Sequence, residues 1–303
     1  CKPMKGTSKR GRTLNEDIAL MKELKNSEKD KAENIMITDM LRNDMGKISD
    51  TGSVKVLSEF DIEKYPTVWQ MTSSVKSQTR ANITAIFEAL FPCASVTGAP
   101  KVSSMKIISE IEDQPREIYT GAIGYIAPNN EAQFSVPIRT ILSNKKIDRS
   151  VYGTGSGIVW DSEWEKEWDE CQNKSAILSV SHQNFELFET MRWDSNRGIF
   201  LEELHLNRLK DSAEFYNFKF SRKKINDKLH DYLKNLEPES EKIIRLFLAK
   251  DGETRLTTSA YKENNKDKSQ LISLAMQPVD SDDLSLYHKT TIRSVYENAI
   301  GEN

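Results

Sequence analysis

Residues 153–174, GTGSGIVWDSEWEKEWDECQNK, constrain the fold more than any other stretch of the chain. A glycine-rich turn leads into a short apolar strand and then directly into a helix. Ser162 and Glu165 have the spacing of a capping box, which predicts where that helix begins. The spacing also places three carboxylates and one ammonium on a single helical face, at steps of four, three and four residues: Glu163, Glu167, Glu170 and Lys174.

This acidic face has two interpretations. Three like charges on one face cost stability unless a cation compensates them. The face is either solvated, with Lys174 as its ionic partner, or it has a binding role. The glycine-rich segment before the helix favours the binding role because it lets the backbone approach another group closely.

The composition limits the classes of partner. The 303 residues are enough for two domains, and the net charge of −3 gives no strong field for nucleic acid or an acidic membrane. The three cysteines, Cys1, Cys93 and Cys171, form no C-x-x-C pair, so neither a zinc site nor a disulfide framework is expected. No apolar run approaches 18 residues, and no signal peptide is expected. We therefore expect a cytoplasmic protein with free thiols and no membrane or nucleic-acid partner.

The pattern of periodicities predicts two domains. Consecutive strands joined by short turns suggest antiparallel pairing, so we expect a layered α+β domain over residues 1–180, a linker at 181–184 and a second domain over 185–303. Helices are predicted at 14–25, 29–45, 82–91, 101–112, 162–177, 202–217 and 221–235. Strands are predicted at 66–75, 119–127, 133–142, 150–159, 185–192, 197–201, 242–250, 254–260 and 270–277. Because the chain opens on Cys1 and stops at Asn303 without a closing element, we expect a piece of a longer protein.

Two segments near the start carry candidate functional residues. Lys5 lies in PMKGT, and Glu33 lies just ahead of an apolar helical run in AENIMITDMLRND. Each residue has an ordinary alternative. A lysine before Gly-Thr is commonly a surface charge, and a glutamate in a first helical turn commonly complements the helix dipole.

Two further segments suggest anion binding. In SVTGAPK, residues 95–101, a tight turn leads into a helix N-terminus, which suits an anion, although a plain loop-to-helix turn has the same pattern. Arg139 in VPIRTI falls within a predicted apolar strand. A buried arginine needs a partner, so either a bound carboxylate or an internal salt bridge is expected there.

Taken in order, six motifs resemble the C-terminal part of the chorismate-utilising enzymes, a family that includes anthranilate and isochorismate synthases. The resemblance covers residues 1 to about 178. It implies the C-terminal part of a layered antiparallel-sheet fold that binds chorismate. The motifs are PMKGT, IMITDMLRND, SVTGAPK, IYTGAIGY, VPIRTI and GSGIVWDSEWEKEWDECQNK.

The resemblance implies roles for individual residues. Glu33 and Glu170, with Glu167 beside them, match the carboxylates that hold Mg²⁺, an ion that prefers hard oxygen ligands. The ion would hold one chorismate carboxylate and polarise the C4 hydroxyl. The residues matching the rest of the substrate pocket are Arg139, Tyr119, Gly155 and Ser156 for the other carboxylate, Lys174 near the ring carboxylate, and Thr97 and Gly98 in a substrate-lining turn.

Lys5 indicates which reaction follows. Aminodeoxychorismate synthases have lysine at this position, whereas anthranilate and salicylate synthases have alanine. The resemblance implies that the Lys5 amine attacks C2 of chorismate as the C4 hydroxyl leaves. Ammonia from a glutamine amidotransferase partner would then add at C4 and expel the lysine, so the attacking amine must be neutral. The family's general acid and base lie upstream of PMKGT, so we expect residues 1–303 alone to be inactive as a synthase.

The second half resembles another family. FELFETMR, GIFLEELHLNRLKDSAEFYNF and PVDSDDLSLYHKTTIRSVYENA are similar to the N-terminal α/β domain of class IV pyridoxal-phosphate enzymes. The resemblance implies that Lys289 carries pyridoxal 5'-phosphate and that Arg208 grips its phosphate, a task suited to a bidentate guanidinium. The alternatives are a loop charge for Lys289 and a helix-surface ion pair for Arg208.

Together the two halves imply an enzyme that forms p-aminobenzoate for folate biosynthesis. The first half would aminate chorismate to 4-amino-4-deoxychorismate, and the second would eliminate pyruvate from that product. Two alternatives remain open. One is an anthranilate-synthase-like enzyme fused to an aminotransferase, and the other is a non-catalytic partner that docks an amidotransferase.

Overall fold

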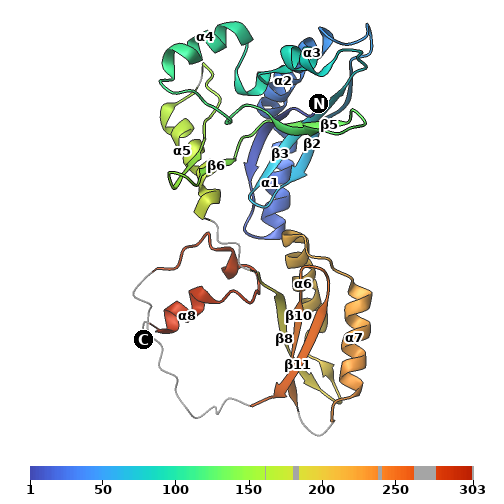
Figure 1. Ribbon diagram of the computed structural model, residues 1–303. Coiled ribbons are helices and arrows are strands. Elements are labelled where there is room, and N and C mark those ends of the chain that lie inside the picture. Colours follow the sequence, from blue (N-terminus) through green and yellow to red (C-terminus); the bar gives the residue numbers. More distant parts are fainter. Residues whose placement is uncertain (161, 180–183, 238–240, 263–277, 302–303) are drawn as a thin grey trace. The chain divides into compact units, whose positions relative to one another are not determined.

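The computed structural model describes residues 1–303 except 161, 180–183, 238–240, 263–277 and 302–303 (Figure 1). The chain divides into two compact units. The first contains Cys1–Lys9 and Met21–Ser181, and the second contains Arg10–Leu20 and His182–Asn303. Helix α1 (Leu14–Asn26) therefore contributes to both units.

The first unit contains a three-stranded antiparallel sheet covered by one long helix. The strand order is β1 (Met4–Lys9), β3 (Val68–Lys76) and β2 (Lys55–Lys64). Helix α2 (Glu28–Gly46) packs against β1 and β3. The helix begins after Ser27, whose hydroxyl accepts a hydrogen bond from the Asp30 amide at 3.2 Å, so a capping side chain satisfies one free donor of the first turn.

Strand β1 contains a bulge at Lys5 and Gly6. Met4 pairs with Thr72 and Thr7 pairs with Gln70, so two residues of β1 oppose one residue of β3. Gly6 has a φ of +103°, and a Cβ atom there would lie 3.1 Å from the Cβ of Met71. A bulge re-aims a neighbouring side chain, so Gly6 determines the direction in which Lys5 leaves the sheet.

Asn34 of α2 holds the bulge in place through hydrogen bonds to the sheet backbone. Its side chain is 1% exposed and its Nδ2 donates to the Lys5 carbonyl at 2.9 Å and to the Met71 carbonyl at 3.3 Å. Its Oδ1 accepts a hydrogen bond of 2.6 Å from the Ser73 hydroxyl. Because both ends of this buried amide are hydrogen-bonded, the helix and the sheet hold the Lys5 backbone in one place.

The remainder of the first unit consists of short elements. These are α3 (Ile83–Leu90), a 3₁₀ turn (Ala94–Val96), α4 (Lys101–Ile111), the ribbon β4 (Ile123–Ile126) with β5 (Ala132–Ser135), the ribbon β6 (Ile141–Asn144) with β7 (Arg149–Tyr152), α5 (Trp164–Ser175) and a 3₁₀ turn (Ala176–Ser179). No single helix among the described residues is long and apolar enough to cross a membrane. The bent pair Ile83–Val96 and Lys101–Ile111 reaches the required length and apolar composition only when its two parts are taken together.

The second unit contains a four-stranded antiparallel sheet. The strand order is β11 (Thr254–Ala260), β10 (Lys242–Leu248), β8 (Leu187–Asp194) and β9 (Gly198–Ile199). Its helices are α6 (Glu202–Tyr216), α7 (Arg222–Lys234) and α8 (Ser294–Gly301), with a 3₁₀ turn at Leu284–Leu286. The core joins side chains of the sheet with those of α6 and α7: Leu187, Met191, Ile244, Leu246, Leu206, Leu209, Ile225 and Leu229.

The expected fold class, an α+β chain with antiparallel sheets, is confirmed, since every strand pair in the described residues is antiparallel. The predicted strand at 133–142 is wrong, because Pro137 and the bend around it separate β5 from β6. The strands expected at 119–127 and 150–159 are shorter, beginning at Ile123 and ending at Tyr152. The expected strand at 270–277 lies outside the described residues.

Candidate functional site

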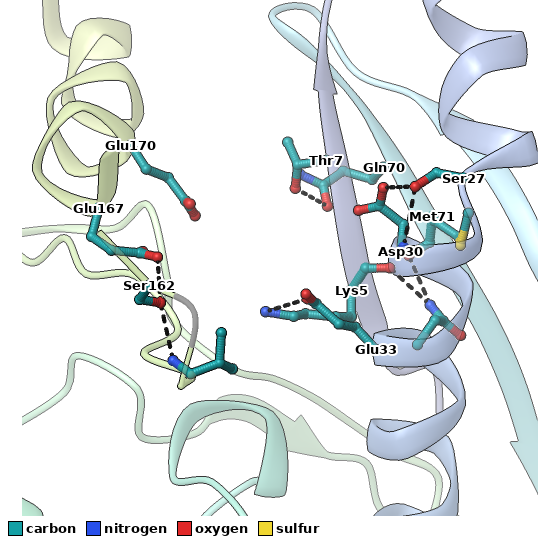
Figure 2. A network of polar contacts seen from close by, with 12 residues as sticks. Lys5, Thr7, Ser27, Asp30, Glu33, Gln70, Met71, Ser162, Glu167 and Glu170 are labelled. Atoms are coloured by element: carbon teal, nitrogen blue, oxygen red, sulfur yellow. Dashed lines mark hydrogen bonds and ion pairs between the residues drawn. The ribbon is translucent and has the colours of Figure 1, made fainter. Parts of the chain in front are cut away.

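Lys5 and Glu33 form the centre of a polar cluster in the first unit (Figure 2). The Lys5 Nζ, on β1, lies 3.1 Å from the Glu33 Oε2, on α2. The side chains are 33% and 24% exposed, so both are accessible from one side. The structure therefore brings the first two candidate residues together as an ion pair at the edge of the sheet.

The glycine-rich segment before α5 passes close to Lys5 and Tyr119. A Cβ atom on Gly157 would lie 3.1 Å from the Lys5 Nζ, and one on Gly153 would lie 2.4 Å from the Tyr119 ring. A Cβ atom on Gly155 would lie 3.1 Å from the Tyr119 hydroxyl. These glycines are needed for close approach, as expected from the sequence. Burial raises the pKa of Tyr119, so its hydroxyl stays protonated.

Glu167 on α5 faces the same cluster. Its Oε1 accepts a hydrogen bond of 2.7 Å from the Ser162 hydroxyl. The Ser156 hydroxyl, then that of Ser162, and more weakly the charge of Lys5 lower the pKa of Glu167. Helix α5 begins at Trp164, so the predicted capping box is wrong in detail, because Ser162 contacts Glu167 rather than marking the helix start.

Glu170 and Lys174 form an ion pair along α5. The distance between the Lys174 Nζ and the Glu170 Oε1 is 2.5 Å, and the same ammonium donates to the Gly155 carbonyl at 2.9 Å. This is the pairing that the solvated-face interpretation expects. Figure 2 nevertheless shows the Glu170 carboxylate extending from α5 toward the side of β1 and α2, so the two interpretations are compatible.

The carboxylates of Glu33, Glu167 and Glu170 are ligands that Mg²⁺ prefers, but they do not form a complete coordination shell by themselves. Across the described ranges, no three His, Cys, Asp or Glu side chains lie close enough to hold a metal. Mg²⁺, however, commonly takes one or two protein carboxylates and completes its octahedron with water and substrate. The Glu167 Oε2 is buried with no hydrogen-bond partner among the residues described, as expected of an oxygen that awaits a donor or a cation. The donor set therefore fits, with Glu33, Glu167 and Glu170 as the residues that would hold the ion.

The turn at Thr97 and Gly98 is tied to the rest of the unit. The Thr97 hydroxyl donates to the Cys93 carbonyl at 3.2 Å, and Gly98 has a φ of +117° that favours glycine. Helix α4 begins at Lys101, whose ammonium lies 2.9 Å from the Asp44 carboxylate on α2. This ion pair fixes the turn to the helix that carries Glu33.

Arg139 does not lie inside a strand as predicted. It occupies the bend between β5 and β6 with a φ of +53°. Within the described parts of the chain no carboxylate forms a salt bridge with Arg139, so the internal salt bridge that was the alternative is absent there. Burial raises the pKa of Tyr152, and the positive charge of the Arg139 guanidinium partly opposes that rise.

In the second unit, Lys289 and Arg208 both lie beside β8. The Lys289 carbonyl accepts a hydrogen bond of 3.0 Å from the Phe188 amide, and its ammonium lies 5.1 Å from the centroid of the Phe188 ring. Burial lowers the pKa of Lys289, an effect that Glu189 opposes and Arg208 reinforces. Arg208, on α6, forms a bidentate pair with Glu189 at 2.7 and 2.5 Å.

Comparison with known proteins identifies both units. Residues 1–179 match the family model described as chorismate binding enzyme. The chain belongs to the chorismate binding enzyme family. Residues 186–299 match the model described as amino-transferase class IV. Both resemblances noted in the sequence are therefore confirmed.

The relatives of this chorismate-binding chain carry two names. Probable aminodeoxychorismate synthase of Oryza sativa subsp. japonica is 43% identical over 198 residues, which are 64% of this chain and 22% of that protein. Anthranilate synthase component 1 of Aquifex aeolicus is 42% identical over 180 residues, which are 58% of this chain and 36% of that protein. The matched residues thus span only about a fifth to about a third of the length of these relatives.

A solved structure supports the fold of the first unit. The protein described as the 2,3-dihydroxybenzoate-specific isochorismate synthase DhbC from Bacillus anthracis superposes with a TM-score of 0.51 at 23% identity. The match covers 59% of this chain and 48% of that chain. The expected chorismate-binding fold is therefore confirmed for the family member described here.

Three polar residues beside these sites were not expected from the sequence: the buried Asn34 and Glu189, and the partly buried His205. Glu189 had a detectable signal. It occupies an inward position in the alternating strand LFETMRW, between Leu187 and Met191, where a charge is unusual. Asn34 had no such signal, because one polar residue on a helix is normally exposed.

We expect Asp44→Asn to destabilise the first unit by about 2 kcal/mol at pH 7. Burial acts to raise the pKa of Asp44, but hydrogen bonds from Lys47 and Lys101 outweigh it and hold the pKa below 3.8. A carboxyl group whose pKa is depressed on folding contributes stability above its unfolded pKa and loses it as the pH falls through the folded value. The variant should therefore approach the wild type in urea unfolding below the ordinary pKa of 3.8.

Asp39→Asn is the matched control for Asp44→Asn. Asp39 lies on the same helix and pairs with Arg42 at 2.7 Å, but both side chains are about half exposed or more, so little change in stability is expected. A loss at Asp44 that is equally large at pH 7 and at low pH would contradict the ion-pair explanation.

Proposed function

We propose that the whole protein aminates chorismate to 4-amino-4-deoxychorismate and then eliminates pyruvate to give p-aminobenzoate, a step of folate biosynthesis. Lys5 is the nucleophile of the first reaction, and ammonia comes from a glutamine amidotransferase partner. The relatives support the chorismate-binding part, but aminodeoxychorismate and anthranilate synthases are equally similar, at 43% and 42% identity. Similarity alone therefore does not select between the two reactions.

The position of Lys5 carries the proposal. The β1 bulge and the Asn34 amide fix its backbone, and its ammonium extends toward Gly157, where no side chain intervenes. A nucleophile needs this kind of fixed position and open approach. Alanine at this place, as the resemblance implies for anthranilate synthases, would offer no nucleophile.

The other residues of the first unit bind and orient the substrate in this proposal. Glu33, Glu167 and Glu170 would hold Mg²⁺, and the bound ion would supply Lewis-acid polarisation of the departing hydroxyl. Tyr119, Gly155 and Ser156 surround one chorismate carboxylate together with Arg139. Lys174 and the Thr97–Gly98 turn line the remainder of the pocket.

The second unit uses pyridoxal 5'-phosphate, which the match to the class IV aminotransferase family implies. Lys289 would hold the cofactor and Arg208 would bind its phosphate. Bound, the cofactor supplies an electron sink for the elimination. The lowered pKa of Lys289 raises the fraction of neutral amine, which is the form that reacts with a carbonyl group.

Product analysis of the whole protein tests the proposal. With chorismate, Mg²⁺, pyridoxal 5'-phosphate and ammonium salt, we expect p-aminobenzoate and one equivalent of pyruvate. Anthranilate as the only aromatic product would support the anthranilate-synthase alternative. Binding of a glutaminase without any turnover would support the non-catalytic docking alternative. Residues 1–303 alone should convert no chorismate, and detectable conversion would contradict the expected upstream acid and base.

A further inference from the structure

Glu189 is a charged side chain at a core-facing position of β8. It is 1% exposed, and its neighbours on the same face of the strand, Leu187 and Met191, are completely buried. A buried carboxylate is tolerated only when it is paired and hydrogen-bonded. The partners of Glu189 therefore indicate why it is there.

Both oxygens of Glu189 are occupied by residues of α6. The Oε1 accepts a hydrogen bond of 2.7 Å from the Arg208 Nε, and the Oε2 accepts one of 2.5 Å from the Arg208 Nη2. The His205 Nδ1 lies 2.8 Å from the Oε2. The tautomer with its proton on Nδ1 is the one that can donate to this oxygen, and the Arg208 Nη2 lies 3.4 Å from the same nitrogen. His205 and Arg208 are three residues apart and share one helical face.

This arrangement leaves one edge of Arg208 available. Its Nε and Nη2 are bound to Glu189, whereas its Nη1 contacts no acceptor in the parts of the chain that are described. The side chain is 49% exposed. The guanidinium is therefore held from the buried side and presents its other edge outward. A planar fork fixed in this way is suited to a phosphate or carboxylate.

Lys289 belongs to the same neighbourhood. Its backbone is hydrogen-bonded to Phe188, the residue next to Glu189, and its ammonium lies over the Phe188 ring. The charges of Glu189 and Arg208 both act on the Lys289 amine. Lys289, Arg208 and the buried Glu189 thus lie in the part of the second unit that is proposed to bind the cofactor.

We propose that Glu189, supported by His205, is a positioning residue that fixes the free edge of Arg208 for the phosphate of pyridoxal 5'-phosphate. The inference rests on the proposed function of the second unit. Glu189 itself does not contact the phosphate. Without its charge, Arg208 remains cationic but loses the contact that sets its orientation, so phosphate recognition weakens while recognition of the pyridine ring does not.

The test compares two ligands that differ only in the phosphate. The dissociation constants of pyridoxal 5'-phosphate and of pyridoxal are measured by absorbance on the cofactor-free whole protein. In Glu189→Gln we expect the affinity for pyridoxal 5'-phosphate to fall about tenfold and the affinity for pyridoxal to stay unchanged. A purely structural role would weaken both ligands equally, and that result would overturn the inference.

Two further variants isolate the effect. Glu203→Gln removes another glutamate–arginine pair of α6, with Arg222 at 2.7 Å, and should bind both ligands as the wild type does. Glu189→Gln combined with Arg208→Ala should bind pyridoxal 5'-phosphate as Arg208→Ala alone does, because Glu189 acts through Arg208. A double variant that binds tenfold more weakly than Arg208→Ala would contradict this.

The inference can still be tested if Glu189→Gln does not fold or if the wild type does not bind the cofactor. Should Glu189→Gln fail to fold by circular dichroism, His205→Leu replaces it and should show the same selective loss, to a smaller extent. An unchanged ratio of the two affinities in His205→Leu would then overturn the inference. Should the wild type bind no pyridoxal 5'-phosphate, the proposed cofactor is wrong. Inorganic phosphate then serves as the probe, and equal binding by wild type and Glu189→Gln would also refute the positioning role.

Discussion

Lys5→Ala in the whole protein is expected to lower kcat for the ammonia-dependent amination of chorismate by about a thousandfold or more. The variant keeps the sheet but removes the amine that forms the covalent intermediate. Its neighbours Glu33 and Glu167 remain, so chorismate should still bind with a similar KM. Initial rates with saturating ammonium salt, followed by chromatography of the aminated product, measure the effect.

Lys9→Ala is the matched control for Lys5→Ala. Lys9 ends the same strand and is exposed, so its loss should leave kcat within about twofold of the wild type. A Lys5→Ala variant that keeps most of its amination rate would refute the nucleophile and favour the anthranilate-synthase alternative. A large rise in KM with unchanged kcat would instead show that Lys5 only binds substrate.

Lys289→Ala should abolish pyruvate release while leaving amination of chorismate unchanged. Lys289 lies in the second unit and Lys5 in the first, and each unit has its own polar cluster. We expect 4-amino-4-deoxychorismate to accumulate and the visible absorbance of lysine-bound cofactor to disappear. Pyruvate is measured by a coupled dehydrogenase assay, and the cofactor by its spectrum.

Lys234→Ala serves as the control for Lys289→Ala. Lys234 is 75% exposed on α7 and pairs with Asp231 at 3.0 Å, so pyruvate release should match that of the wild type. Pyruvate release that persists in Lys289→Ala at more than about a hundredth of the wild-type rate would exclude the proposed role of this lysine.

The sequence predicted the helices more accurately than the strands. The helix expected at 29–45 is Glu28–Gly46, because Ser27 caps its start and residues of high helix propensity fill much of it. The strands expected at 242–250 and 254–260 form the β10–β11 hairpin, whose turn contains Gly252 at a φ of +93°. Strand β1 was missed since the bulge at Lys5 and Gly6 interrupts its alternation. Strand β2 was missed since Leu57 points outward and Ser58 inward, so its hydrophobic pattern does not follow its alternating burial.

The sequence indicated which residues belong to the candidate site, but it did not indicate how their side chains are arranged in space. Ordered motifs indicated Lys5, Glu33 and Glu167, and the structure places them in one cluster. The bulge that aims Lys5 depends on pairing between β1 and β3, which are about 60 residues apart in sequence. Such contacts leave no local periodicity, so only the folded chain shows them.

The segment from Gly153 to Gly157 has a consequence for how this enzyme can change. Its three glycines alternate, so an extended backbone turns them to one side, and that side meets Tyr119 and Lys5. At these three positions the site is therefore bounded by main chain, while Ser156 of the same segment contributes a hydroxyl beside Glu167. New substrate preferences would have to arise at Ser156 or at the side chains of other segments, because a side chain at any of the three glycines would collide with Tyr119 or Lys5.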